Sequence, residues 1–340
     1  MTMNIGNNTN NTNCIFIITQ QIIIYCGSFM CLFGNFSCLL LILTFIHNQF
    51  YRQHVSSVYL LASSIAELIQ LNTVLLSFIL SDGFKYKLFS HSILFCKLTW
   101  YFVPISAMSS ITFILTGTIE RFLLLKQHQR FIKKNSSKKH IIIVFCILLF
   151  WSIFAIPNLI YFNIDLKTKK CKILTLQSGW YPIFFTYSYL FLYCLLPSIL
   201  LSIFSLLTIL NLKQYNIQIN YKNKRRLEQL NCDLIKILLT QSFLIILSSI
   251  PITVYRSYDY LTRYKIKSRE QLQLEYLINS ICRLFIFLYS SCDFYLNLYI
   301  SKIFRKQFRK LTKHWYLKLF STWNCMSNCR FSQSISRCPS

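Results

Sequence analysis

The sequence is short of charged residues and of the residues that interrupt helices. Charged side chains make up 14% of its 340 residues, and only 10 residues are Asp or Glu. Soluble domains usually carry about a quarter charged residues, so this balance favours a membrane protein. Six glycines and six prolines are few for so long a chain and indicate that most of it is helical. The sequence has no Cys/His cluster with zinc spacing and no glycine-rich phosphate loop, so neither a metal site nor a nucleotide site is predicted.

Basic residues, by contrast, are abundant. Lys and Arg number 36, and the net charge is +26. In a soluble protein such an excess suggests nucleic acid as a partner. Here the bases cluster in short links between apolar runs, which points to the headgroups of anionic membrane lipids, and no nucleic acid is expected to bind. Most of the 14 cysteines lie inside the apolar runs, where they are expected to pack as small hydrophobic residues.

Seven apolar runs are long enough to cross a membrane, since a transmembrane helix needs about 20 mostly apolar residues. They cover residues 21–46, 56–80, 95–125, 141–163, 182–211, 235–257 and 276–300. The predicted fold is therefore all-α, a seven-transmembrane helix bundle over 21–300 with a tail at 1–20 and a further segment at 301–340. The seventh run is the weakest by hydropathy because it contains Arg283 and Asp293. The polar N-terminus has no basic region typical of a cleaved signal peptide, so the first run is predicted to stay as an anchor.

The distribution of Lys and Arg between the loops predicts the orientation, because cytoplasmic loops carry the excess. Twenty-two bases fall on the face of the C-terminal tail, against ten on the face of the N-terminus. The N-terminus is therefore predicted to be extracellular and the C-terminus cytoplasmic, in a multi-pass protein of the plasma membrane. Two glycosylation sequons, at Asn7 and Asn10, agree with this orientation, although chance in an Asn/Thr-rich stretch explains them equally well.

The third run has informative residues at both ends. Cys96 stands near its outer start, and Arg121, next to Glu120, follows 25 residues later. Helix of that length measures about 37 Å, so the charged pair is predicted at the cytoplasmic boundary and not in mid-membrane. Snorkelling of Arg121 explains its position taken alone. Cys171 lies in the second outer loop, on the same oxidising side as Cys96, so we expect a disulfide that ties this loop to the third helix.

Together these features resemble the rhodopsin-like (class A) G-protein-coupled receptors, over roughly residues 20–320. The landmarks are Gly34–Asn35 in the first run, Glu67 in the second where the family usually has aspartate, Cys96 and E-R-F at 120–122 in the third, Trp151 and Pro157 in the fourth, Pro197 in the fifth, and F-R-K after the seventh. Each landmark is weak alone, but seven spans with all of them form a strong pattern. The resemblance implies a receptor, not an enzyme, that binds an extracellular ligand and signals through a heterotrimeric G protein. In it, Arg121 pairs with Glu120 in the closed state and is released to the G protein on activation.

Two departures from the family pattern matter for function. The family's C-W-x-P in the sixth span is Ser248-Ser249-Ile250-Pro251 here, and its N-P-x-x-Y in the seventh is D-F-Y-L-N at 293–297. The missing tryptophan, proline and tyrosine affect the usual toggle and the locking of the active state. A receptor-like protein with lost or atypical coupling is therefore the main alternative. A transporter or channel is less favoured, because ionisable residues inside the spans are few and no inverted repeat is evident.

Five polar residues inside the predicted spans match positions at which the family forms a water-filled sodium site. They are Asn35, Glu67, Ser110, Ser290 and Asp293. Buried carboxylates need partners or a cation, and two that lie close together titrate as a pair. The sequence leaves open a bound sodium ion, a shared proton or a static hydrogen-bonded core. No other cofactor is expected.

Near the outer ends of the helices the sequence suggests a pocket for an anionic ligand. The candidate residues are Lys97, Val103, Arg256 and Arg283. Val103 stands where the family's amine receptors carry an aspartate, so a peptide is favoured over an amine. Arg283 either binds an anionic group, such as a peptide carboxylate, or forms a salt bridge with Glu275 or Asp259.

The segment after the seventh run predicts a membrane-surface helix. Apolar residues recur there at helical spacing among Lys and Arg, which is typical of an amphipathic helix with a basic face. Cys325, Cys329 and Cys338 follow it and are either palmitoylation sites or free cytosolic thiols.

Overall fold

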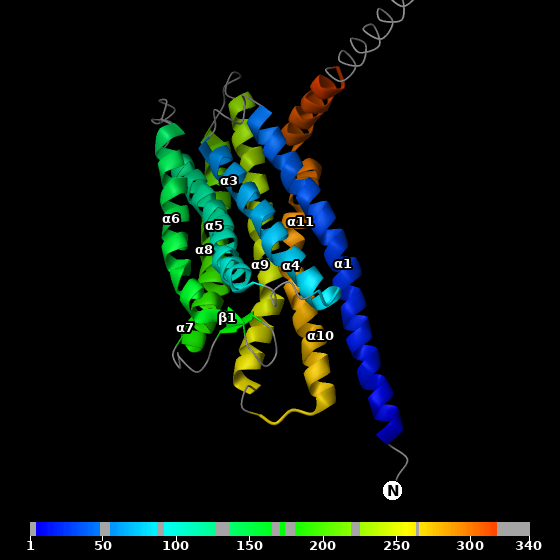
Figure 1. The fold of residues 1–340 in the computed structure, drawn as a ribbon. Coiled ribbons are helices and arrows are strands. Elements are labelled where there is room, and N and C mark those ends of the chain that lie inside the picture. Colours follow the sequence, from blue (N-terminus) through cyan, green and yellow to red (C-terminus); the bar gives the residue numbers. More distant parts are fainter. Residues whose placement is uncertain are drawn as a thin grey trace, which may run out of the picture.

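Long helices account for nearly all of the chain that the computed structural model describes. The described residues are 5–47, 55–86, 92–126, 137–164, 171–173, 181–218, 225–262 and 265–317. The helices lie side by side as a bundle (Figure 1). In chain order the elements are α1 (Ile5–His47), α3 (Val55–Gln70), η1 (Leu71–Leu75), α4 (Leu76–Phe78), η2 (Ile79–Gly83), α5 (Ile93–Lys126), α6 (Ser137–Tyr161), β1 (Phe162–Ile164), β2 (Cys171–Ile173), α7 (Tyr181–Tyr189), η4 (Leu190–Leu195), α8 (Leu196–Gln218), α9 (Arg225–Thr262), α10 (Arg269–Ile286) and α11 (Leu288–Ile300). A further helix covers residues 302–317.

Seven helical stretches among the described residues are long and apolar enough to cross a membrane. They are Cys14–His47, Ser57–Gly83, Ile93–Leu123, Lys139–Tyr161, Phe191–Asn211, Lys236–Asp259 and Arg269–Ile300. Each overlaps one of the seven predicted runs, which confirms the predicted seven-helix bundle. The second and fifth spans each contain π-helical turns, η1 and η2 in the second and η4 in the fifth. The η4 turn lies immediately before Pro197, which lacks the N–H that a regular helix would use there.

The first and seventh spans begin earlier than predicted. Helix α1 starts at Ile5 and not near residue 21, and no proline interrupts the chain between them. Helix α10 starts at Arg269 and not at residue 276, because a capping box fixes its first turn. The Ser268 hydroxyl accepts from the Gln271 N–H at 3.2 Å, and the Gln271 side chain accepts from the Ser268 N–H at 3.0 Å. A break at Phe287 then separates α10 from α11 within the seventh span.

Helix α5 is the central element of the bundle, and α6 is peripheral. The most apolar window of the α5 span is 61% buried inside the protein, against 11% for the α6 span. Helix α5 contacts α3, α6, α8 and α9, whereas α6 stands at one side of the bundle (Figure 1). The largest buried cluster joins α5 to α9 and α11, through residues such as Ile111, Leu238 and Phe294. Helix α5 is therefore the element against which the candidate functional residues are placed.

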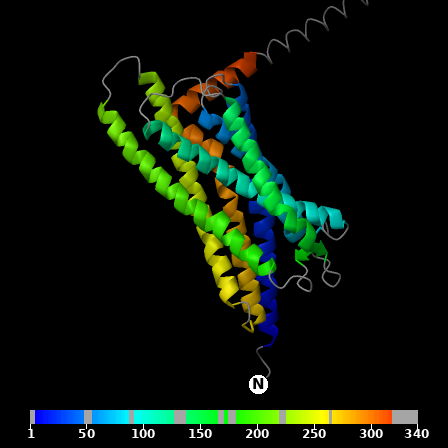
Figure 2. The same ribbon diagram turned by 90° about the vertical axis from the view of Figure 1, so that its left-hand side faces the viewer.

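A short hairpin closes one end of the bundle. Strands β1 and β2 pair antiparallel, with Ile164 opposite Cys171. Cys171 forms the expected disulfide with Cys96 at the start of α5, and the Trp100 ring stacks on Phe162 at a centroid distance of 4.4 Å. The hairpin and the start of α1 lie at the same end of the bundle, and the 302–317 helix lies at the other (Figures 1 and 2). The two ends of the bundle thus differ in the elements that they carry.

Candidate functional site

A cluster of buried polar side chains lies inside the bundle between α3, α5, α9 and α11. Glu67 is fully buried, and one of its carboxylate oxygens accepts from the Ser110 hydroxyl at 3.1 Å. The Ser110 hydroxyl also lies 3.0 Å from that of Tyr289. The Asp293 carboxylate, 1% exposed, lies on the same helix as Tyr289, one turn further along α11. Two carboxylates in one desolvated place are stable only if a proton, a cation or other donors compensate their charge.

The remaining partners of Asp293 are two amides. Gln241 Nε2 donates to Asp293 Oδ2 at 2.7 Å, and Asn297 Nδ2 donates to Oδ1 at 3.0 Å. Asn297 stands where the family has tyrosine, so this departure places an amide on the carboxylate. Gln241 was not among the predicted site residues. Its only signal in the sequence is an amide side chain in the middle of an apolar span.

Two of the predicted network residues form their hydrogen bonds with groups other than the carboxylates. Asn35 accepts from Asn72 Nδ2 at 2.6 Å and donates to the Cys31 carbonyl at 2.8 Å. The structure therefore does not join Asn35 to the cluster, because its amide is engaged between α1 and η1. The buried Ser290 hydroxyl donates to the Phe287 carbonyl of its own helix at 3.0 Å.

Several acceptor oxygens of the cluster are not used by hydrogen bonds among the described residues, and such oxygens can bind a hard cation or a proton. Glu67 Oε2, Gln241 Oε1 and Asn297 Oδ1 are buried and have no hydrogen-bond partner among the described residues. All three are acceptor oxygens, which is the ligand type that hard cations prefer. The residues present thus fit a sodium ion, and a proton on one carboxylate would satisfy the same need.

The Glu120–Arg121 pair lies at the opposite end of α5 from the disulfide. Arg121 is only 4% exposed, so it is buried in the bundle and does not snorkel to the surface. Glu120 Oε1 lies 3.5 Å from His140 Nδ1 on α6, and the same nitrogen lies 3.1 Å from the Tyr59 hydroxyl on α3. Glu120 is therefore connected to two neighbouring helices through one imidazole. Neither His140 nor Tyr59 was predicted, since only tertiary packing brings them to Glu120.

The predicted ligand-pocket residues lie toward the end that carries the hairpin. Arg283 Nη1 is 3.9 Å from Asp82 Oδ2, and its guanidinium lies 5.3 Å from the Phe78 ring centroid. The two salt bridges considered from sequence involved Glu275 and Asp259, so the observed partner, Asp82 of η2, is a different one. Lys97, Val103 and Arg256 are each partly exposed.

Glu275 has partners of its own. Lys267 Nζ donates to Glu275 Oε2 at 2.7 Å, and the Tyr258 hydroxyl donates to Oε1 at 3.1 Å. The hydrogen bond to Glu275 raises the pKa of Lys267 above its usual value. These contacts fasten the end of α9 to α10.

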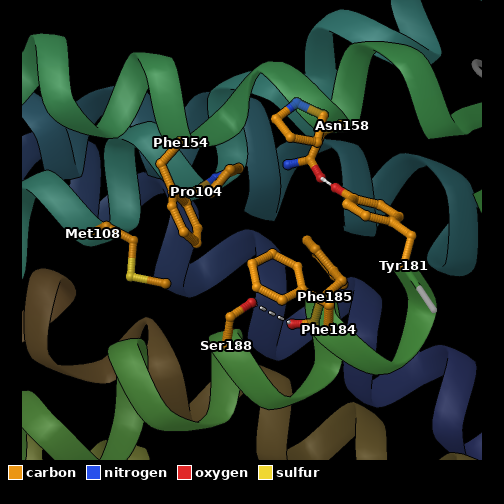
Figure 3. A pocket seen from close by; sticks show the side chains of 9 residues that line it. Pro104, Met108, Phe154, Asn158, Tyr181, Phe184, Phe185 and Ser188 are labelled. Carbon is orange, nitrogen blue, oxygen red and sulfur yellow. Dashed lines mark hydrogen bonds between the residues drawn. The ribbon is translucent and has the colours of Figure 1, made fainter.

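A small cavity of about 20 Å³ lies between α5, α6 and α7, and sequence reasoning did not predict it. Apolar side chains such as Met108, Phe154 and Phe184 line most of it (Figure 3). Its polar groups are paired within the protein, since the Tyr181 hydroxyl donates to Asn158 Oδ1 and Asn158 Nδ2 donates to the Trp100 carbonyl. The cavity is too small for a drug-sized ligand and carries no free polar group, so we do not assign the ligand to it.

Several predicted modification sites fall where the structure gives no account of them. Cys325, Cys329 and Cys338 lie outside the described residues. The backbone of Asn7 and Asn10 belongs to α1, but their side chains are outside the described part. Palmitoylation and glycosylation therefore stay predictions.

Comparison with known proteins gives one clear match. The family model described as "7 transmembrane receptor (rhodopsin family)" matches residues 34–330. This range includes all of the spans except the first part of the first one. The comparison with curated proteins gives no match.

Proposed function

Because the chain belongs to the rhodopsin family of seven-transmembrane receptors, we propose that this multi-pass membrane protein binds an extracellular peptide and signals through a heterotrimeric G protein. The observation that carries the proposal is the buried Arg121 beside Glu120 at the end of α5 remote from the disulfide. In this proposal the charge of the buried Arg121 becomes available to the G protein when the helices part. In this proposal the N-terminus is extracellular and the C-terminus cytoplasmic, at the plasma membrane.

The proposed ligand is a peptide with an anionic group. Arg283 is 37% exposed at its side chain, so a ligand can reach it while it stays within 3.9 Å of Asp82. Guanidinium groups bind carboxylates through directed hydrogen bonds, and this site has no aspartate at Val103 for an amine. Lys97 and Arg256 add positive charge near the same end of the bundle. These features support an acidic peptide over an amine.

The proposed signalling end is controlled by Glu120. Its carboxylate lies 3.5 Å from His140 Nδ1, and Arg121 is the next residue along α5. In this proposal the acid restrains the arginine in the closed arrangement. The substitution Glu120→Gln removes the charge while keeping the shape, and we expect it to raise basal signalling. Unchanged basal signalling in a receptor that responds to agonist would count against this role.

The third part of the proposed function concerns the buried carboxylates of Glu67 and Asp293. We propose that Glu67 and Asp293, with Ser110 as a further ligand, hold either a sodium ion or a shared proton. Stability of the purified receptor that rises with sodium, but not with equal choline, would support the ion. Stability that depends on pH alone would support the proton. A hydrogen-bonded core without either function predicts neither dependence.

The function is tested by screening a peptide library against cells that express the chain, with calcium and cyclic nucleotide as readouts. A peptide that produces a signal, lost in Arg121→Ala at equal surface expression, supports receptor and coupling together. The alternative, a receptor-like protein with lost coupling, predicts peptides that bind the cell surface without any signal. No binding peptide at all would contradict the peptide class.

A further inference from the structure

A single amide connects α9 to α11 in the interior of the bundle. Gln241 on α9 is 3% exposed and Asp293 on α11 is 1% exposed, so their 2.7 Å hydrogen bond is shielded from solvent. An amide that donates to a carboxylate makes a stronger bond than two neutral groups do. The two helices also pack directly against each other, with Ile237, Leu238 and Phe294 in one buried cluster. The polar bond therefore lies within an otherwise apolar contact.

Asp293 accepts hydrogen bonds from two amides, and that of Gln241 comes from a different helix. Gln241 donates to Oδ2 from α9, and Asn297 donates to Oδ1 from one turn further along α11. The Asn297 bond stays within its own helix and would move with it. The Gln241 bond, in contrast, must break when α9 and α11 separate.

Ser248 and Ser249 stand where the family has cysteine and the large switch tryptophan, and their hydroxyls give little restraint between α9 and α11. The Ser248 hydroxyl donates to the Ile245 carbonyl at 3.1 Å, and that of Ser249 donates to the Ile246 carbonyl at 3.0 Å. Both bonds stay within α9. The further contact of Ser249 is with the Ser198 hydroxyl on α8, at 3.3 Å. Within the part of the chain that the structure describes, Gln241 provides polar restraint of α9 against α11, about 15 Å along the helix from Pro251.

We propose that Gln241 is a positioning residue that holds α9 against α11 through Asp293, and that breaking this hydrogen bond is a required step in activation. The proposal rests on the function proposed above, in which the helices part to admit the G protein, and it takes α9 as the helix that moves. Separation leaves Asp293 without its cross-helix donor in a desolvated interior, so the bond favours the closed arrangement. Without it, the balance shifts toward the open arrangement with no ligand present.

The test uses full-length receptor in nanodiscs and measures GTPγS uptake by a panel of purified G proteins without any agonist. We expect Gln241→Leu, similar in length but without a donor, to raise basal uptake about tenfold. Gln241→Glu should raise it further, because it places two acids against each other. The double variant Gln241→Glu/Asp293→Asn restores an amide–carboxylate pair with donor and acceptor exchanged, and should lower uptake below that of Gln241→Glu alone. A role in packing alone predicts no such rescue.

Two comparisons keep the result interpretable. Ser242→Ala is the matched control, since Ser242 is equally buried one residue further along and donates only to the Leu238 carbonyl of its own helix. Its basal uptake should equal that of the unchanged protein. Uptake raised by Glu120→Gln but not by Gln241→Leu would overturn the inference and leave the proposed function standing. Uptake raised by neither variant would overturn both.

Discussion

The ion pair between Arg283 and Asp82 leads to a prediction that separates a ligand contact from a structural contact. The atoms are 3.9 Å apart, and the side chains are 37% and 27% exposed. At that distance two unit charges attract by about 4 kcal/mol at an effective dielectric constant of about 20, and by about 1 kcal/mol in bulk water. Because both groups are about one-third exposed, we take the lower figure, so about 1 kcal/mol is the expected coupling.

The perturbations are Arg283→Ala, Asp82→Asn and the double variant. Thermal unfolding of the purified receptor should give a coupling energy near 1 kcal/mol in a double-mutant cycle, smaller at high salt because partly exposed charges are screened. Potency of an acidic peptide agonist should behave differently. Arg283→Ala should lower it about tenfold, whereas Asp82→Asn should raise it about fivefold. That rise is expected because the ligand no longer competes with Asp82 for the guanidinium, and 1 kcal/mol corresponds to a factor of about five.

The control is a second ion pair toward the same end of the bundle. Glu275→Gln disrupts the 2.7 Å contact with Lys267 without changing Arg283. It should affect unfolding and leave potency unchanged. If Arg283→Ala and Asp82→Asn lower potency equally, the pair serves only to hold η2 against α10, and the assignment of Arg283 to the ligand is wrong.

Two further predictions concern helix packing and the contacts of Glu120. A Cβ on Gly34 would lie 2.8 Å from Leu71 Cδ1, whereas one on Gly117 would lie 3.5 Å from its nearest atom. Gly34→Ala should therefore lower the unfolding temperature relative to Gly117→Ala, by the equivalent of about 1–3 kcal/mol. Equal unfolding temperatures would contradict the close approach at Gly34. His140→Leu should raise agonist-free GTPγS uptake several-fold, because Glu120 loses its partner on α6; uptake equal to that of the unchanged receptor would show that His140 does not restrain Glu120.

The fold was predictable because its signals are local. Span length, hydropathy and the spacing from Cys96 to Arg121 depend only on the rise of a helix and the thickness of a bilayer. The disulfide to Cys171 followed from both cysteines facing the same side. The early start of α10 had a local signal too, in the Ser268–Gln271 capping box, which hydropathy alone does not detect.

The side-chain partners were less predictable because they depend on how each helix is rotated and packed. Asn35 lies in the expected helix, yet its amide bonds Asn72 instead of joining the carboxylates. Arg283 has the expected kind of partner, but the acid comes from η2 and not from its own or the preceding span. His140 reaches Glu120 from the start of α6, which no spacing within one helix could indicate.

The structure gives the departures from the family pattern a common physical reading. Serine at 249 removes a large apolar side chain from α9, and asparagine at 297 in place of tyrosine adds a second amide on Asp293 beside that of Gln241. The contacts of Glu120 are separate from these hydrogen bonds. They link α5 to α6 and α3 through His140 and Tyr59, and neither residue bonds to Asp293. In the mechanism we propose, the bond of Gln241 limits how far α9 opens, and Glu120 limits how readily Arg121 becomes available to the G protein. Restraints that share no partner contribute independently, so the proposed G-protein coupling does not depend on the family's usual toggle.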